Sequence, residues 1–135
     1  MVDKSKQSKV RELVPRRGGD DRLWQVADST FVLPKNYEVI ELIGSGAYGK
    51  VVAARDTNEP DGEDLVAIKK MERVFEHKTF ARRTLRELKM MRLLQHENVL
   101  SAKTIIKPAS VEDFDGLYVV MELMDTDLGS VIKSK

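Results

Sequence analysis

The sequence predicts an α+β fold in which a five-stranded antiparallel sheet carries one main helix packed on it. Short stretches typical of β-strands occur three times before, and twice after, one long helical pattern. The loops between these stretches are short, as in hairpins, which favours antiparallel neighbours. A length of 135 residues is suited to one domain of ordinary size.

The first three strands are expected at 37–43, 50–56 and 65–70. The first alternates from Tyr37 and ends at a glycine-rich stretch, and the second is rich in β-branched residues. Between the second and third, residues 58–63 have the composition of a turn, because Asn, Pro, Asp and Gly tolerate turn geometry.

The main helix is expected at 79–94, followed by strands at 103–106 and 117–122 and by a short helix beginning near Asp127. Apolar residues recur there at the spacing of one helical face. That face consists of Phe80, Leu85, Leu88, Met91 and Leu94.

Residues 1–29 are expected to be a disordered basic tail, so that the folded part comprises residues 30–135. The segment is polar and shows no useful periodicity. An alternative is a docking or nuclear-import segment with Leu13 and Val14 as apolar anchors. Trp24, the single tryptophan, is the candidate for holding the tail against the folded part.

The charge balance gives no reason to expect nucleic acid or a membrane as a partner, because 23 basic and 22 acidic residues leave a net charge of +1. The absence of cysteine excludes disulfides and thiolate metal sites. No signal-peptide core precedes the fold, and the longest apolar runs fall short of the ~20 residues that span a bilayer. We expect a cytoplasmic or nuclear protein.

A glycine-rich hairpin is the first candidate for chemistry. Gly44, Gly46 and Gly49 form a GxGxxG pattern, which alone is weak because dinucleotide-binding folds also use it. In those folds the last glycine opens a helix, whereas here Gly49 leads into the strand-forming residues 50–52. The glycines are therefore expected in a hairpin that can cover phosphates, with an ordinary glycine-rich turn as the alternative.

Lys69 is the second candidate. Alternate residues of a strand share a face, so Ala67 and Lys69 point the same way. The small Ala67 leaves room for the flat ring of a nucleotide, and Lys69 can reach the phosphates of that nucleotide. Glu87, eighteen residues on (87 − 69), is expected to hold the Lys69 ammonium. An exposed Lys–Glu pair contributes only ~0–1 kcal/mol to stability, so its expected role is positioning. Lys70 points to the opposite face and is expected to be solvated.

From Tyr37 onward the sequence resembles the amino-terminal lobe of a protein kinase, and more narrowly it is similar to the mitogen-activated protein kinases. Four motifs match in order and spacing, at 44–49, 83–88, 96–99 and 122–128. The resemblance implies a kinase small lobe with its hinge and the start of the next helix over 30–135. It also implies an activity in the complete parent, transfer of the ATP γ-phosphate to a protein serine or threonine.

The resemblance further implies the residues of an ATP site, from phosphates to ribose. They are Gly44, Ser45, Gly46, Ala47, Tyr48 and Gly49 over the phosphates, Val51 and Ala67 above the adenine, Lys69 with Glu87, Met121 as gatekeeper, Glu122 and Met124 at the hinge, and Asp127 at the ribose. Arg83 and Arg86 are implied to contact a phosphothreonine, the alternative being two solvated helix residues.

The catalytic-loop and metal-binding motifs of a kinase do not occur in these 135 residues. Asp113-Phe-Asp-Gly116 lies before the hinge and is not expected to bind metal, so Mg²⁺, protein substrates and an upstream kinase are expected only for a complete parent. This chain alone is expected to be inactive. Two hypotheses remain: a truncated part of a MAP-kinase-like enzyme, or a complete non-catalytic interaction module that competes for kinase partners.

Overall fold

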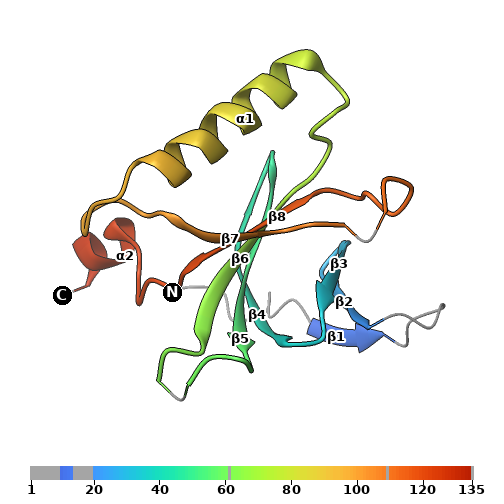
Figure 1. Ribbon diagram of the computed structural model, residues 1–135. Coiled ribbons are helices and arrows are strands. Elements are labelled where there is room, and N and C mark those ends of the chain that lie inside the picture. The colour runs from blue at the N-terminus through green and yellow to red at the C-terminus, as the bar shows by residue number, and fades with distance from the viewer. Residues whose placement is uncertain (1–9, 14–19, 61, 109, 135) are drawn as a thin grey trace.

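The computed structural model describes residues 10–13, 20–60, 62–108 and 110–134 (Figure 1). The elements, in chain order, are β1 (Val10–Leu13), β2 (Asp21–Val26), β3 (Ser29–Pro34), β4 (Tyr37–Gly46), β5 (Gly49–Asp56), β6 (Leu65–Met71), α1 (Lys78–Leu93), β7 (Ala102–Ile106), β8 (Leu117–Glu122) and α2 (Leu128–Lys133). Among these residues no helix combines the length and hydropathy needed to cross a bilayer.

The main sheet has five antiparallel strands in the order β4-β5-β6-β8-β7, which confirms the predicted fold. Each expected strand is present, and β4 extends three residues beyond the predicted end into the glycine-rich hairpin. The register places Val51 opposite Lys69 and Ala67 opposite Met121. The strand that carries Lys69 therefore lies at the centre of the sheet, between β5 and β8.

A second sheet, in the order β1-β2-β3, corrects the expectation of a disordered tail through residue 29. Strand β2 pairs with β3 along its whole length, and Ala27 adopts a positive φ of 54° in the turn between them. The alternation in β2 covers too few residues to stand out from a polar segment, yet it buries Trp24 and Val26. Trp24 thus anchors this segment, as predicted. Val14 and the basic residues at 1–9 and 16–17 lie outside the described residues.

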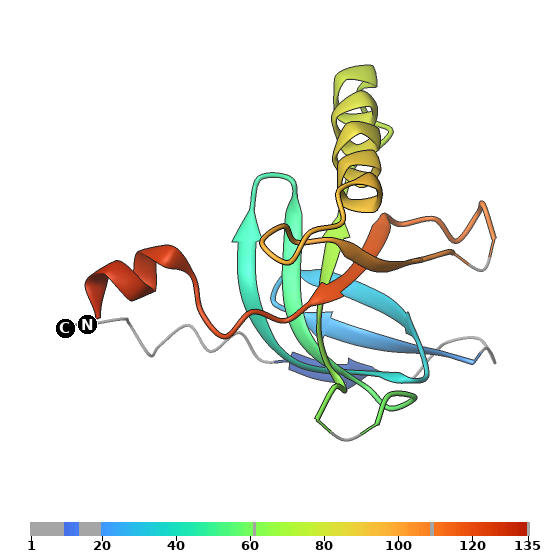
Figure 2. The same cartoon turned by 60° about the vertical axis from the view of Figure 1, so that its left-hand side comes forward.

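The core is divided in two by the main sheet. Val66 and Ile68 of β6 face the three-stranded sheet, where they join a buried cluster with Phe31. Ala67 and Met71 alternate to the other face and belong to a second, smaller cluster. Figure 2 shows the three-stranded sheet and α1 on different sides of the main sheet.

Helix α1 lies where it was predicted, within one residue at each end, but it packs less deeply than its sequence indicated. None of its residues is buried. Leu88 and Met91 of the predicted face pack against the second cluster, whereas Leu85 and Leu94 are 56% and 46% exposed. At 100° per residue, Thr84 rather than Leu85 falls on the half-buried face, which explains the difference.

Candidate functional site

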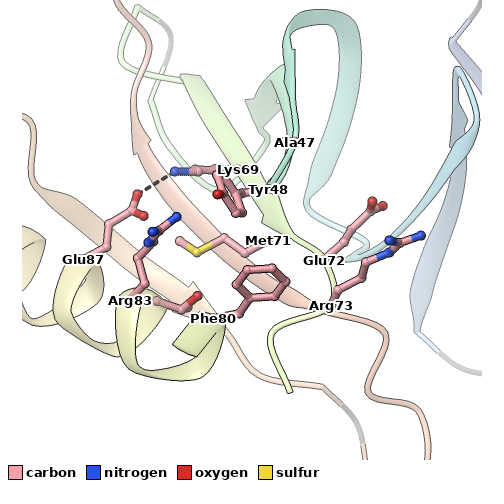
Figure 3. A pocket seen from close by; sticks show the side chains of 10 residues that line it. Ala47, Tyr48, Lys69, Met71, Glu72, Arg73, Phe80, Arg83 and Glu87 are labelled. Atoms are coloured by element: carbon pink, nitrogen blue, oxygen red, sulfur yellow. Dashed lines mark hydrogen bonds and ion pairs between the residues drawn. The ribbon is translucent and has the colours of Figure 1, made fainter. Parts of the chain in front are cut away.

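An ion pair joins the centre of the sheet to the helix. Lys69 Nζ of β6 lies 2.5 Å from Glu87 Oε1 of α1, and both side chains are partly exposed (Figure 3). Strand alternation directs Lys69 away from the three-stranded sheet, and Glu87 lies on the half-buried side of α1. The predicted pairing is confirmed. It holds an ammonium group beside the glycine-rich hairpin, where it can bind an anion.

The hairpin between β4 and β5 requires glycine at one of its three glycine positions. Gly49 has a φ of +147°, and a Cβ there would lie 1.9 Å from the carbonyl oxygen of Lys70. Gly44 would make only ordinary contact with Val51, and nothing lies within 4 Å of a Cβ at Gly46. The protein itself does not explain glycine at position 46. The open space there suits close approach of a ligand to the backbone, which is what a phosphate chain needs.

A cavity of about 310 Å³ separates the hairpin tip from α1. It is lined by Ala47 and Tyr48 of the hairpin tip and by the ion pair of Lys69 and Glu87. Phe80, which was predicted only as a core residue, also lines it. The remaining lining residues are Met71, Glu72, Arg73, Arg83 and Thr84. The cavity has charges of both signs on its wall and two aromatic side chains, Tyr48 and Phe80, as Figure 3 shows.

A second cavity, of about 590 Å³ and widely open, lies at the far end of the strands. It is lined by Glu122 and Met124, the predicted hinge residues, and by Ile43, Leu123 and Asp125, which the prediction did not include. Ser45 is on β4 opposite Lys50 and lines neither cavity. Six of the predicted ATP-site residues thus line two separate cavities, and the other predicted ATP-site residues line neither of them: Gly44, Ser45, Gly46, Gly49, Val51, Ala67, Met121 and Asp127.

The residues predicted to enclose the adenine lie on the sheet face that carries Lys69. Ala67 and Met121 are buried in the second cluster and lie opposite each other on neighbouring strands. Val51 packs against that cluster from β5. These apolar side chains suit stacking against a purine ring.

Asp127 has a local structural role. It is the N-cap of α2, where Oδ1 accepts a hydrogen bond from the Ser130 amide at 2.9 Å and Oδ2 accepts one from the Ser130 hydroxyl at 2.6 Å. These bonds favour the charged form and hold the pKa of the Asp127 carboxyl below its usual value. Such a group accepts hydrogen bonds readily, but its two oxygens already have protein donors.

A third, basic cavity of about 230 Å³ lies on the outer side of α1. It is lined by Thr79, Arg82, Arg83 and Arg86. Arg82 was not predicted, although the spacing i, i+3, i+4, i+7 from Thr79 places all four residues on one face of a helix. Within the described parts of the chain, no carboxylate oxygen lies within 4.0 Å of these guanidinium groups. Their donors are therefore available to an anion.

The burial of Lys70 is another difference from the sequence-based prediction. Lys70 was predicted to be solvated, but it is 4% exposed, because the three-stranded sheet covers its face of β6. Its Nζ donates to the Thr30 carbonyl and to Asp115 Oδ2, each at 2.6 Å. The Tyr118 hydroxyl donates to the same carboxylate at 2.9 Å.

The Asp113–Gly116 segment contributes a carboxylate, Asp115, that accepts hydrogen bonds from Lys70 and Tyr118. Asp113 accepts a hydrogen bond from the Ser110 hydroxyl at 2.8 Å. Throughout the residues that the structure describes, no group of three His, Asp or Glu side chains is arranged to hold a metal ion.

Comparison with known families agrees with this geometry. The protein kinase domain matches residues 37–135, from the start of β4 onward. The chain belongs to the protein kinase family. The sequence resemblance is therefore confirmed, and the five-stranded sheet with its paired lysine and glutamate is the small lobe of a kinase domain.

Within the kinase family the chain is similar to mitogen-activated protein kinases. It is 44% identical over 115 residues to extracellular signal-regulated kinase 1 of Dictyostelium discoideum, covering 85% of this chain and 21% of that protein. It is 47% identical over 108 residues to mitogen-activated protein kinase spk1 of Schizosaccharomyces pombe, covering 80% and 28%. The homolog MMK2 of Medicago sativa is 42% identical over 122 residues, covering 90% and 32%. The chain thus spans between a fifth and a third of these relatives' length.

Proposed function

We propose that this chain is the ATP-binding lobe of a MAP-kinase-like protein serine/threonine kinase. The observation that carries the proposal is the 2.5 Å contact between Lys69 and Glu87 beside a glycine-rich hairpin. A partly exposed ion pair of this kind adds little to stability. Its value lies in holding a cation at a fixed place, which phosphoryl transfer requires because positioning and electrostatics carry most of that reaction.

Each part of the site has a role in this proposal. ATP supplies the phosphoryl group to be transferred. Lys69 attracts its α- and β-phosphate oxygens, and Glu87 keeps the ammonium oriented. Backbone amides of the hairpin at 44–49 cover the phosphates, with Gly46 leaving room for their approach. Ala67 and Val51 contact the adenine, while Met121 limits the depth of the pocket.

The hinge and the basic cavity complete the proposal. The Glu122 carbonyl and the Met124 amide read the adenine edge, and Asp127 accepts hydrogen bonds from the ribose. Arg83 and Arg86 bind a phosphothreonine through charge-assisted hydrogen bonds.

The reaction itself belongs to a complete parent. There, Mg²⁺ would neutralise the charge on the phosphates, the acceptor would be a serine or threonine of a protein, and an upstream kinase would supply the activating phosphate. The 135 residues contain no catalytic-loop or metal-binding motif of a kinase. We propose that the chain alone binds nucleotide without transferring phosphate, in the cytoplasm or the nucleus.

Isothermal titration calorimetry with magnesium-ATP tests this function. The chain should bind with a Kd on the order of millimolar, about −4 kcal/mol, because half of a kinase pocket's walls are absent from it. Lys69→Met should weaken binding further. Lys89→Met removes an equal charge from the exposed side of α1 and is the matched control. Equal binding by wild type and Lys69→Met would refute the phosphate role of Lys69. A Kd in the micromolar range would refute the prediction that the nucleotide pocket of this chain is incomplete.

A second candidate is a non-catalytic interaction module. Its support is a set of exposed apolar side chains on the two helices. They are Leu85, Met90 and Leu93 of α1 and Leu128, Val131 and Ile132 of α2. Sedimentation of the chain mixed with the separately purified large lobe of a MAP kinase tests it. A stoichiometric complex supports the module, and independent sedimentation of the two components excludes this partner.

A further inference from the structure

Arg83 belongs to two cavities on different sides of α1. It lines the basic cavity with Arg82 and Arg86, and it also lines the cavity beneath the glycine-rich hairpin. A helical residue can do this when its side chain crosses the surface of the helix between the two hollows. In Figure 3, Arg83 extends from α1 toward the hairpin.

The contact that Arg83 makes on the hairpin side is with an aromatic ring. Its guanidinium carbon lies 5.1 Å from the ring centroid of Tyr48, within the range of a cation–π interaction. Tyr48 also meets Phe80 of α1 edge to face, with centroids 5.7 Å apart. The tip of the hairpin is therefore attached to α1 through one tyrosine, which is otherwise half exposed at 53%.

Anion binding on the outer side of α1 competes with this attachment. A phosphate monoester can accept two parallel hydrogen bonds from one guanidinium group. Three such groups line the basic cavity, those of Arg82, Arg83 and Arg86. When Arg83 turns its donors to a phosphate dianion, its charge is compensated and its attraction for the Tyr48 ring falls. Phe80 alone then holds the hairpin tip.

We propose that Arg83 and Tyr48 link a phosphate site on α1 to the glycine-rich hairpin, so that a bound phosphothreonine weakens the attachment of the hairpin to the helix. The proposal rests on the proposed function, since it takes the phosphothreonine contact of Arg83 and Arg86 as given. It adds Arg82 as a third ligand and Tyr48 as a positioning residue. With only the Phe80 contact left to break, the hairpin closes over a nucleotide more readily.

Thermodynamic linkage fixes the size of the effect. An exposed cation–π contact corresponds to a factor of about 2–5 in an equilibrium constant. Binding energy spent on breaking that contact lowers phosphate affinity by the same factor. Tyr48→Leu, which removes the ring, should therefore tighten phosphate binding about 2–5-fold. Tyr48→Phe keeps the ring and should bind phosphate as the wild type does.

The experiment is a titration of the isotope-labelled chain followed by nitrogen–proton correlation spectra. The probe is N-acetyl-phosphothreonine methylamide, and the unphosphorylated compound is the control probe. In the wild type and in Tyr48→Phe, we expect the arginine Nε signals and the amides of residues 47–49 to shift with one common dissociation constant. In Tyr48→Leu only the arginine signals should shift, with the tighter constant.

The outcomes separate the two proposals. If the signals of Arg82, Arg83 and Arg86 do not respond to the phosphorylated probe, the phosphothreonine site fails and the link falls with it. If they respond while the hairpin amides of the wild type stay in place, the site stands and the link is overturned. Hairpin shifts that persist in Tyr48→Leu also overturn it, because the phosphate would then reach the hairpin by another route. If Tyr48→Leu does not fold, the shifts of the wild-type hairpin amides alone decide whether the link exists.

Discussion

Replacing Lys70 with methionine removes a buried charge that connects three segments of the chain. Lys70 Nζ donates to the Thr30 carbonyl of β3 and to Asp115 in the loop before β8. Methionine has a similar length and fills the space, so the substitution tests the hydrogen bonds and the charge rather than packing. We expect the free energy of unfolding to fall.

The magnitude follows from the burial of each partner. Removing one member of a fully buried ion pair costs about 3–5 kcal/mol, because the remaining charge has no partner. Asp115 is 37% exposed, so water solvates part of it after the substitution, and the cost falls to about 1–3 kcal/mol. The Thr30 carbonyl loses its donor, which adds about 1 kcal/mol. Together we expect a loss of about 2–4 kcal/mol, against the ~5–15 kcal/mol that stabilises a typical domain.

Urea unfolding measured by the fluorescence of Trp24, the single tryptophan, is the assay, because this residue is buried between the two sheets. Lys69→Met is the matched control: it removes the neighbouring lysine from the other face of β6. Because the ion pair of Lys69 with Glu87 is partly exposed, its loss should change the free energy of unfolding by at most ~1 kcal/mol. If Lys70→Met unfolds at the wild-type urea concentration with an unchanged slope, Lys70 does not connect the sheets and the reasoning is wrong.

Three further substitutions test the hairpin, the core and the buried tyrosine. Gly49→Ala should destabilise the chain by at least ~2 kcal/mol in urea unfolding, because the positive φ and the nearby carbonyl oxygen leave no room for a Cβ, whereas Gly46→Ala should leave stability unchanged. Ile68→Ala, in a fully buried position, should cost about 2–5 kcal/mol; a loss below ~1 kcal/mol would mean that the two sheets close over the cavity. Burial raises the pKa of Tyr118, so below pH ~10 its neutral form is favoured in both states, and as pH rises above this value ionisation in the unfolded chain reduces stability. Tyr118→Phe should therefore lose less stability than the wild type between neutral and alkaline pH, and parallel pH profiles would contradict this assignment.

Local patterns were sufficient to predict the main sheet and the helix. The start of β4 alternates, and β5 and β6 each contain a short apolar run, at 51–54 and 65–68, next to turn or glycine residues, so their type and position could be read directly. The Lys69–Glu87 contact also followed from the sequence, because strand alternation and helical spacing each fix which side a residue occupies. The phosphate and adenine roles of the surrounding residues remain predictions.

Long-range packing was the part that the sequence could not reveal. The three-stranded sheet escaped prediction because β1 has only four residues and β2 shows little alternation. Without that sheet, nothing indicates that the face of β6 bearing Lys70 is covered, so a lysine there was expected in water. Arg82 is a different case, since its helical spacing of four residues from Arg86 is visible in the sequence.

The shallow packing of α1 has a consequence for how the lobe moves. Both sheets contribute residues that are fully buried, whereas α1 has none. Segments with few buried apolar side chains open locally at lower free energy than the core that surrounds them. Amide hydrogens of α1 should therefore exchange with solvent faster than those of β5, β6 and β8. Glu87 travels with the helix and Lys69 stays with the sheet, so their ion pair forms and breaks in a native state whose strands remain folded.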